Sequence, residues 1–323
     1  MLYVSTRNNS DAYTAHRALH ECNSPDGGYY FPFRLPYLSA DELYAIKKQS
    51  PGETVAYILN LFFGLRLTGW DVECVIGRFP FQIVPMNYRL LMAEVWRNPG
   101  ESWDYLLRNL YGLLLGKKGN SAMPAGWALI AIEIALFFGI YSAADSLPEN
   151  GLDIAVTAGD FSDVISVLFA KDMGFPVNVT IFAFNENGAV WDLINKGELS
   201  TGVTAVKTSI PELDHAVPNY LEYLLFRCFG NSEVIRYADA CEHKANYYID
   251  DEYLHQLNHD LFAAVVSTSR VELIKSSMYR TNQYNIDPYT ALAYGGLQDY
   301  RAYTGISKDT LILSKNRIVH TKE

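Results

Sequence analysis

Residues 152–182 read LDIAVTAGDFSDVISVLFAKDMGFPVNVTIF, and this stretch decides the fold. The apolar run 152–156 predicts a buried strand, and residues 157–161 predict a turn. From residue 162 to residue 173 apolar side chains recur at helical spacing, and the following Gly-Phe-Pro ends the helix and opens a second strand. A strand, a helix and a strand in this order predict a βαβ unit whose strands are parallel, because such crossovers are right-handed.

Two further segments extend this unit. Residues 310–314, TLILS, predict another strand of the same sheet. The apolar run 129–144 predicts a buried helix rather than a membrane span, because it is too short to cross a bilayer comfortably and it carries Glu133.

The first ninety or so residues predict a small, mostly helical unit. Ser39 and Glu42 form a capping box at the start of one helix, and residues 53–63 predict a second helix that a glycine ends. We therefore expect an α/β protein with a helical N-terminal domain over residues 1–95 and a parallel-sheet domain over residues 96–323.

Composition argues against several classes of function. The 323 residues carry 26 lysines and arginines and 36 aspartates and glutamates, a net charge of −10. This balance argues against a nucleic-acid partner, because phosphate backbones are bound mainly by lysine and arginine. Four scattered cysteines without a C-x-x-C pair do not make a disulfide scaffold. The start of the chain has no secretory signal pattern, so we expect a soluble, cytoplasmic protein with no membrane segment.

Two local patterns suggest ligand sites, and each has a plainer explanation. The turn at Gly159 precedes a helix N-terminus, where free N–H groups and the helix dipole favour a phosphate or carboxylate. Tight turns between strands and helices need glycine in any case, so both explanations stay open. Cys241, His255 and His259 suggest zinc, but their spacing is not a standard ligand pattern, so we expect no metal.

Taken together, several segments resemble threonine synthase, a family of pyridoxal-phosphate (PLP) enzymes of fold type II. The matching segments, in the family's order, are 3–7 (YVSTR), 24–32 (SPDGGYYFP), 120–138, 157–164 (TAGDFSDV, against the family's TGNFGDV), 183–187, 208–226 and 287–291. The resemblance implies a parallel-sheet domain like the large domain of fold type II enzymes. It also implies the cofactor-binding residues Gly159, Asp160, Phe161, Ser162 and Asn185.

The sequence departs from the family where the family does its chemistry. Lys118 has the spacing of the Schiff-base lysine, six residues after Gly112, but the residues around that lysine are not kept. In the family, on the order of a hundred residues, enough for a small domain, separate this lysine from the next motif. Here that motif follows at once, at residue 120. The resemblance therefore implies that the small lid domain, with its loop for the substrate carboxylate, is largely deleted.

Two single residues also differ from the family. Lys315 takes the place of a threonine beside the cofactor's pyridine nitrogen, and an ammonium there disfavours the protonated ring. Ser162 takes the place of a glycine in the phosphate loop.

These departures favour a shortened, catalytically degenerate relative, a pseudoenzyme that binds a small anionic ligand or a protein partner. The alternative is an active PLP-dependent lyase or synthase that acts on an amino-acid substrate through Lys118. A third hypothesis places new chemistry, with a metal on Cys241, His255 and His259, in the space that the lid has vacated. Aromatic side chains would refill this cleft, form a homodimer interface or simply pack in the core; they include Tyr29, Phe31, Phe79, Phe81, Trp96 and Trp103.

Overall fold

A computed structural model describes the whole chain except residues 118, 120, 145–146, 149–150 and 319–323. The strands are β1 (Leu2–Ser5), β2 (Tyr13–Thr14), β3 (Tyr30–Pro32), β4 (Gln82–Met86), β5 (Leu90–Glu94), β6 (Leu152–Thr157), β7 (Val177–Phe184), β8 (Glu198–Ser200), β9 (Asn246–Tyr248), β10 (Leu261–Val265) and β11 (Thr310–Ser314). The helices are α1 (Ala15–His20), α2 (Ala40–Ile46), α3 (Pro51–Phe63), α4 (Gly69–Ile76), α5 (Trp103–Leu114), α6 (Gly126–Ser142), α7 (Ser162–Asp172), α8 (Ala189–Lys196), α9 (Leu221–Phe229), α10 (Asn231–Glu242), α11 (Asp251–Asn258), α12 (Thr268–Asn282) and α13 (Pro288–Thr304), with a short 3₁₀ helix at Pro211–Leu213.

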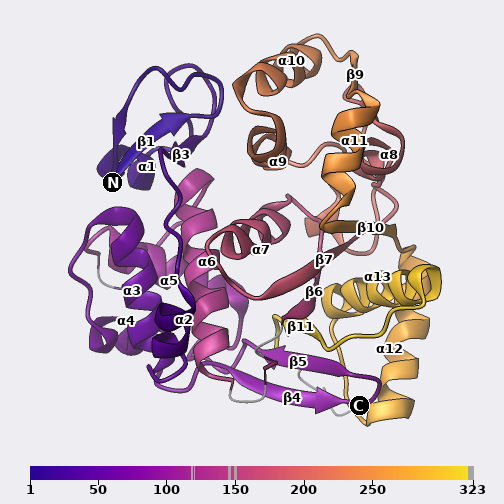
Figure 1. The fold of residues 1–323 in the computed structure, drawn as a ribbon. Helices are drawn as coiled ribbons and strands as arrows, with labels where there is room; N and C mark the ends of the chain where they lie inside the picture. The colour runs from indigo at the N-terminus through magenta and orange to yellow at the C-terminus, as the bar shows by residue number, and fades with distance from the viewer. Residues whose placement is uncertain (118, 120, 145–146, 149–150, 319–323) are drawn as a thin grey trace.

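A six-stranded sheet in the order β10-β7-β6-β11-β5-β4 forms the centre of the molecule (Figure 1). All neighbouring strands are parallel except β4, which runs antiparallel to β5 at one edge. The predicted βαβ unit is confirmed as β6-α7-β7, with β6 and β7 side by side. The predicted late strand is β11, which lies between β6 and β5.

Helices cover both faces of this sheet, as expected where parallel strands are buried (Figure 1). Helix α7 packs on one face with α6 behind it, and α13 packs on the other face with α12. All 17 residues of α6 are buried, including Glu133, so the predicted buried helix is confirmed. No helix in the described part of the chain has both the length and the apolar character of a membrane span.

The N-terminal part combines helices with a three-stranded sheet in the order β2-β1-β3, which the sequence did not predict. The capping box of Ser39 and Glu42 is present at the start of α2. Helix α3 begins at Pro51, two residues before the expected start, because Ser50 provides a second capping box with Glu53. The expected helix stop is also present, since Gly64 adopts the left-handed conformation with a φ of 66°.

The central sheet begins earlier in the chain than the expected domain boundary at residue 95. Strands β4 and β5 precede that residue, and β5 hydrogen-bonds to β11 in the central sheet. Short strands with an irregular apolar pattern gave no sign of this pairing in the sequence.

Candidate functional site

The main candidate site lies at the carboxyl ends of β6 and β11, where ligands commonly bind in open α/β sheets. A pocket of about 460 Å³ opens here, and we call it the carboxyl-end pocket. Its walls come from the turn after β6, the start of α5, the middle of α6, the 212–215 loop and the residues after β11. Its described lining residues are Ser102, Trp103, Asp104, Leu107, Met123, Leu129, Glu133, Thr157, Ala158, Gly159, Asp160, Ser162, Asp163, Glu212, Leu213, His215, Tyr289, Lys315 and Asn316.

The Gly159 turn is held in an unusual backbone conformation. Phe161 has a φ of 78°, which is rare for a bulky side chain. Its ring is fully buried and packs against Phe182 and Phe184 of β7, with ring centroids 5.4 and 6.2 Å apart. Packing of this ring therefore fixes a strained turn, and strain of this kind is typical of ligand sites.

The chain's own carboxylates occupy the region around the N-terminus of α7, the helix that follows the Gly159 turn. The backbone N–H of Ser162 donates to Oδ1 of Asp160 at 3.0 Å. Asp163, in the first turn of α7, accepts from Nζ of Lys315 at 2.5 Å. Glu133, reaching up from α6, accepts from the hydroxyl of Ser166 at 2.8 Å and from that of Ser162 at 3.4 Å.

We call Glu133, Asp163 and Lys315 the buried charge cluster. Burial, and next the charge of Asp163, raise the pKa of Glu133 well above its usual range. Burial by itself lowers the pKa of Lys315, but Asp163 and Glu133 outweigh this effect, so the net shift is upward. The cluster therefore contains a charged Lys315–Asp163 pair and a glutamate that tends to keep its proton.

Replacing Glu133 by glutamine is expected to stabilise the protein at neutral and alkaline pH, by on the order of 1 kcal/mol. The pKa of Glu133 is raised by folding, so the wild type loses stability as pH rises above the unfolded value of about 4.3. Glutamine does not titrate and can still accept from Ser166. Urea unfolding at a series of pH values measures the difference, which should vanish under acidic conditions.

The exposed Glu272 on α12 provides a matched control for this experiment, since its side chain is 69% exposed. Glu272→Gln should shift stability little at any pH. A stability difference between wild type and Glu133→Gln that does not change with pH would contradict the buried, protonated state of Glu133.

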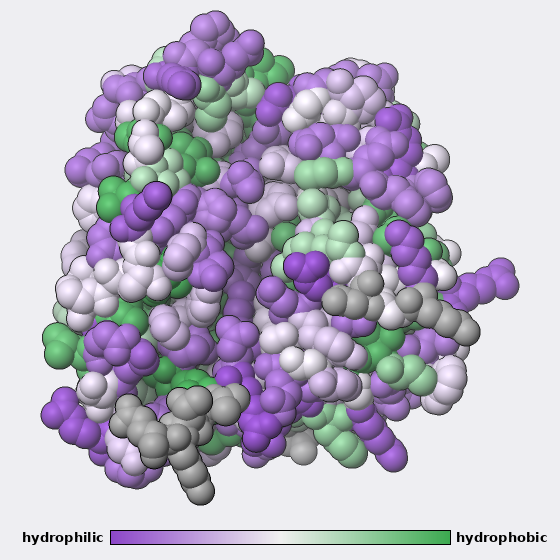
Figure 2. Space-filling view, turned by 180° about the vertical axis from the view of Figure 1, so that it is seen from behind, coloured by the Kyte–Doolittle hydropathy of each residue, from purple (hydrophilic) through white to green (hydrophobic). Residues whose placement is uncertain are grey.

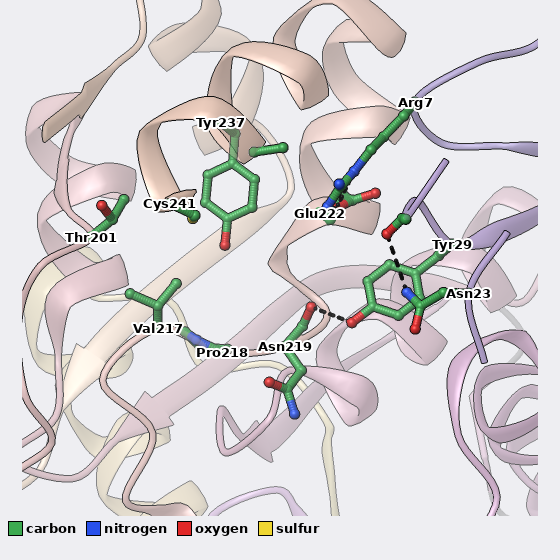
Figure 3. Close-up of a pocket in the computed structure, with 12 residues that line it drawn as sticks. Arg7, Asn23, Tyr29, Thr201, Val217, Pro218, Asn219, Glu222, Tyr237 and Cys241 are labelled. Carbon is green, nitrogen blue, oxygen red and sulfur yellow. Dashed lines mark hydrogen bonds and ion pairs between the residues drawn. The ribbon is translucent and has the colours of Figure 1, made fainter. Parts of the chain in front are cut away.

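A second pocket, of about 320 Å³, lies between the N-terminal sheet and α10 (Figure 3). Its main polar groups already have partners. Arg7 pairs with Glu222 at 2.9 Å, and the hydroxyl of Tyr29 donates to the carbonyl of Asn219 at 3.0 Å. Cys241 lines this pocket, and burial raises the pKa of its thiol, which disfavours the reactive thiolate. This pocket is therefore the weaker candidate.

Both the sequence and the fold of this chain match known proteins. Residues 2–78 match the family model described as the threonine synthase N terminus. The threonine synthase of Pseudomonas aeruginosa is 24% identical over 204 residues, which are 62% of this chain and 43% of that protein. The enzyme of Escherichia coli is 23% identical over 286 residues, 84% of this chain and 59% of that protein.

This chain is similar to the threonine synthases in sequence and in fold. The crystal structure of PLP-bound threonine synthase from Brucella melitensis has the same fold, with a TM-score of 0.86 at 17% identity. That match covers 98% of this chain and 89% of the Brucella chain. The predicted α/β fold of the type II PLP enzymes is thus confirmed. In sequence, the chain matches only about half of the length of the curated bacterial relatives.

The described residues of the Gly159 turn do not fit the phosphate group of PLP. A phosphate would lie beside the carboxylate of Asp160, where the family pattern has an asparagine, and the N–H of Ser162 already donates to that carboxylate. Lys315, which stands where the family has a threonine, is already paired with Asp163. Placing a dianion next to a like charge is unfavourable. The turn that the resemblance indicates is therefore present, but its electrostatics oppose the predicted ligand.

The other predicted cofactor residues lie in different surroundings. Lys118 is outside the described residues. Asn185 is buried and does not line the carboxyl-end pocket; its amide donates to Oδ1 of Asp214 at 2.7 Å and to Thr208 at 3.1 Å. These bonds fix the 206–214 loop, which carries Glu212 and Leu213 into the pocket wall. In this structure Asn185 is a positioning residue for that loop.

The predicted metal ligands are not brought together. Cys241 lies in α10, whereas His255 and His259 are exposed on and after α11. Across the described residues, no three His, Cys, Asp or Glu side chains are placed to hold a metal ion.

Of the aromatic side chains expected to refill the cleft, only Trp103 lines the carboxyl-end pocket. Phe79 is exposed, and Phe81 is buried near Gly139 of α6. The face turned away from the view of Figure 1 is mostly polar, with small apolar areas scattered over it (Figure 2). Among the residues that the structure describes, this face shows no broad apolar surface.

Sequence reasoning did not assign Glu133 and Asp163 to the site. A signal for Glu133 was available, because a single carboxylate inside a 17-residue buried helix needs a partner. Asp163 follows the turn directly, but a carboxylate in the first turn of a helix is common and carries little information.

Proposed function

We propose that this relative of threonine synthase is a pseudoenzyme, which does not make threonine and acts in the cytoplasm as a binding protein. The observation that supports this proposal best is the buried charge cluster. Glu133, Asp163 and Lys315 fill the region where the resemblance expects the cofactor phosphate and ring nitrogen. A PLP enzyme depends on the bound cofactor to stabilise carbanions, and this cluster opposes its binding.

The short connection between α5 and α6 gives independent support. Helix α5 ends at Leu114 and α6 begins at Gly126, so the intervening chain is too short for a lid domain. Without a lid, water enters the carboxyl-end pocket, and the oriented, water-free environment that such reactions need is lost. The scaffold is kept, while the parts that act on a substrate are not.

The turn alone predicts a small anionic ligand, but its surroundings do not favour one. Five of the described lining residues carry carboxyl groups: Asp104, Glu133, Asp160, Asp163 and Glu212. We therefore propose a ligand other than an anion for this pocket.

Incubation with PLP followed by desalting tests the proposal. We expect no visible absorption band from a bound aldimine and no threonine from O-phosphohomoserine, with the Escherichia coli enzyme as positive control. A stable band together with threonine formation would overturn the proposal. A band that disappears in Lys118→Ala, with turnover of another amino acid, would instead establish the alternative, an active PLP-dependent lyase or synthase.

A further inference from the structure

We propose that the carboxyl-end pocket binds a small organic cation, a compound with an ammonium or guanidinium group. This inference rests on the proposed function, because the same space cannot also hold PLP. It specifies the class of ligand that a pocket lined mainly by carboxyl groups would take.

The charge of the pocket is the first argument. Five described lining residues are acidic, and one, Lys315, is a lysine. Asp104, Asp160 and Glu212 lie towards the outside and Asp163 lies at the buried end, whereas the buried Glu133 tends to keep its proton and adds no charge. Carboxylates at both ends of a pocket of about 460 Å³ favour a ligand that carries positive charge along its length.

Unsatisfied polar atoms in the pocket wall are the second argument. The side chain of Asp163 is only 8% exposed, and its Oδ1 has no hydrogen-bond partner, although Oδ2 is paired with Lys315. The indole N–H of Trp103, another buried lining residue, also has no partner. Buried polar atoms rarely stay unpaired, so Oδ1 of Asp163 points to a missing donor, whereas the indole N–H of Trp103 lacks an acceptor that a cation does not supply. A cation would supply the donor that Asp163 lacks.

The surroundings of Lys315 show how such a cation is held. Nζ of Lys315 lies between the carboxylate of Asp163 and the ring of Trp103, 5.3 Å from the ring centroid. An aromatic face beside a carboxylate is a favourable site for an ammonium. The backbone N–H of Trp103 donates to the backbone carbonyl of Lys315 at 3.0 Å, so the backbone fixes the two residues relative to each other. The ligand's charged end would donate to Oδ1 of Asp163, while the ammonium of Lys315 stays on Oδ2.

The pocket favours an organic cation over a metal ion. No described group of three His, Cys, Asp or Glu side chains converges closely enough to hold a metal. The pocket is also far larger than an ion and falls within the usual range for small-molecule sites, about 300–1,000 Å³.

Titration calorimetry with three four-carbon probes tests the charge requirement directly. Putrescine is dicationic, 1,4-butanediol is neutral and succinate is dianionic, while their lengths are similar. We expect putrescine to bind at least about tenfold more tightly than butanediol, and succinate not to bind. Equal binding of putrescine and butanediol would overturn the inference.

Variants locate the site. Asp163→Asn should weaken putrescine binding about tenfold or more, and Asp160→Asn, which changes a less buried residue, should weaken it by a smaller factor. Glu272→Gln, on the distant α12, should leave the affinity unchanged. If Asp163→Asn does not fold, Asp160→Asn alone decides: an unchanged putrescine affinity would place binding elsewhere and overturn the inference.

Two further binding measurements distinguish this inference from the proposed function and from binding of a partner protein. Binding of PLP with a visible band would refute the proposed function and this inference together, whereas a protein that binds neither PLP nor putrescine would refute this inference alone. Nα-acetyl-lysine methylamide represents a lysine of a partner protein. If this lysine analogue binds more tightly than putrescine, the pocket takes a lysine side chain of a partner protein. The proposal of a free small cation would then be wrong.

Discussion

Replacing Trp127 by alanine is expected to lower the free energy of unfolding by about 3–5 kcal/mol. Trp127 stands near the start of α6 and is fully buried. Its ring lies at the centre of an aromatic cluster that joins most of the molecule. The ring centroids of its neighbours lie 6.1 Å away for Tyr3, 5.5 Å for Phe31, 5.3 Å for Phe62, 5.9 Å for Phe169 and 6.2 Å for Tyr223.

The effect is large because these neighbours come from different parts of the chain. Tyr3 and Phe31 belong to the N-terminal sheet, whereas Phe169 belongs to α7 and Tyr223 to α9. Losing the indole leaves a cavity where these parts meet, and hydrogen bonds nearby, such as that from the hydroxyl of Tyr223 to the carbonyl of Tyr30 at 2.9 Å, lose their support. Unfolding of the N-terminal part ahead of the rest would then appear as two urea transitions.

Urea unfolding, followed by circular dichroism and by fluorescence, measures this prediction. Trp127→Phe keeps an aromatic ring and should cost much less. Trp70→Ala, which removes a side chain from a residue that is 73% exposed, is the surface control and should cost little. A loss in Trp127→Ala no greater than that in Trp70→Ala would show that the cluster does not hold the parts together.

Lys315→Met should also destabilise the protein, by about 3–5 kcal/mol. The substitution keeps the length of the side chain but removes the ammonium that pairs with Asp163. Asp163 and Glu133 would then share a buried space with no positive charge from the cluster, and burial already raises the pKa of both carboxyl groups.

A second substitution distinguishes the lost charge from lost packing. Lys315→Met/Asp163→Asn removes both members of the pair and should recover much of the stability, because replacing both partners of a buried pair costs less than breaking it. The single variant should also regain stability at acidic pH, as Asp163 takes up a proton. Urea unfolding of both variants at acidic and neutral pH tests this, and equal losses in the single and double variants would be the contrary result.

The sequence was sufficient for those features that depend on neighbouring residues. The βαβ unit of β6, α7 and β7 was predicted because its apolar spacing is local and its turn carries a glycine. The capping boxes of α2 and α3 are equally local. Strands β1, β2 and β3 have only two to four residues each, so no alternation could reveal them.

The candidate site was only half predictable for the same reason. The Gly159 turn and the departure at Lys315 could be recognised by comparison with the family pattern. The partners of Lys315 could not, because Glu133 approaches the turn only through the packing of α6 against α7. The contacts of Asn185 are also long-range. Its amide was expected beside a cofactor, but it donates to Asp214 and so holds the 206–214 loop.

The place of β11 in the sheet has a consequence for synthesis on the ribosome. This strand fills the gap between β5 and β6, but it follows β6 by more than 150 residues of chain. At about 5–20 residues per second, translation leaves the facing edges of β5 and β6 unpaired for roughly ten to thirty seconds. Unpaired, apolar strand edges are templates for aggregation. The nascent protein therefore exposes two strand edges during this interval, which a protein with consecutive strand order would not.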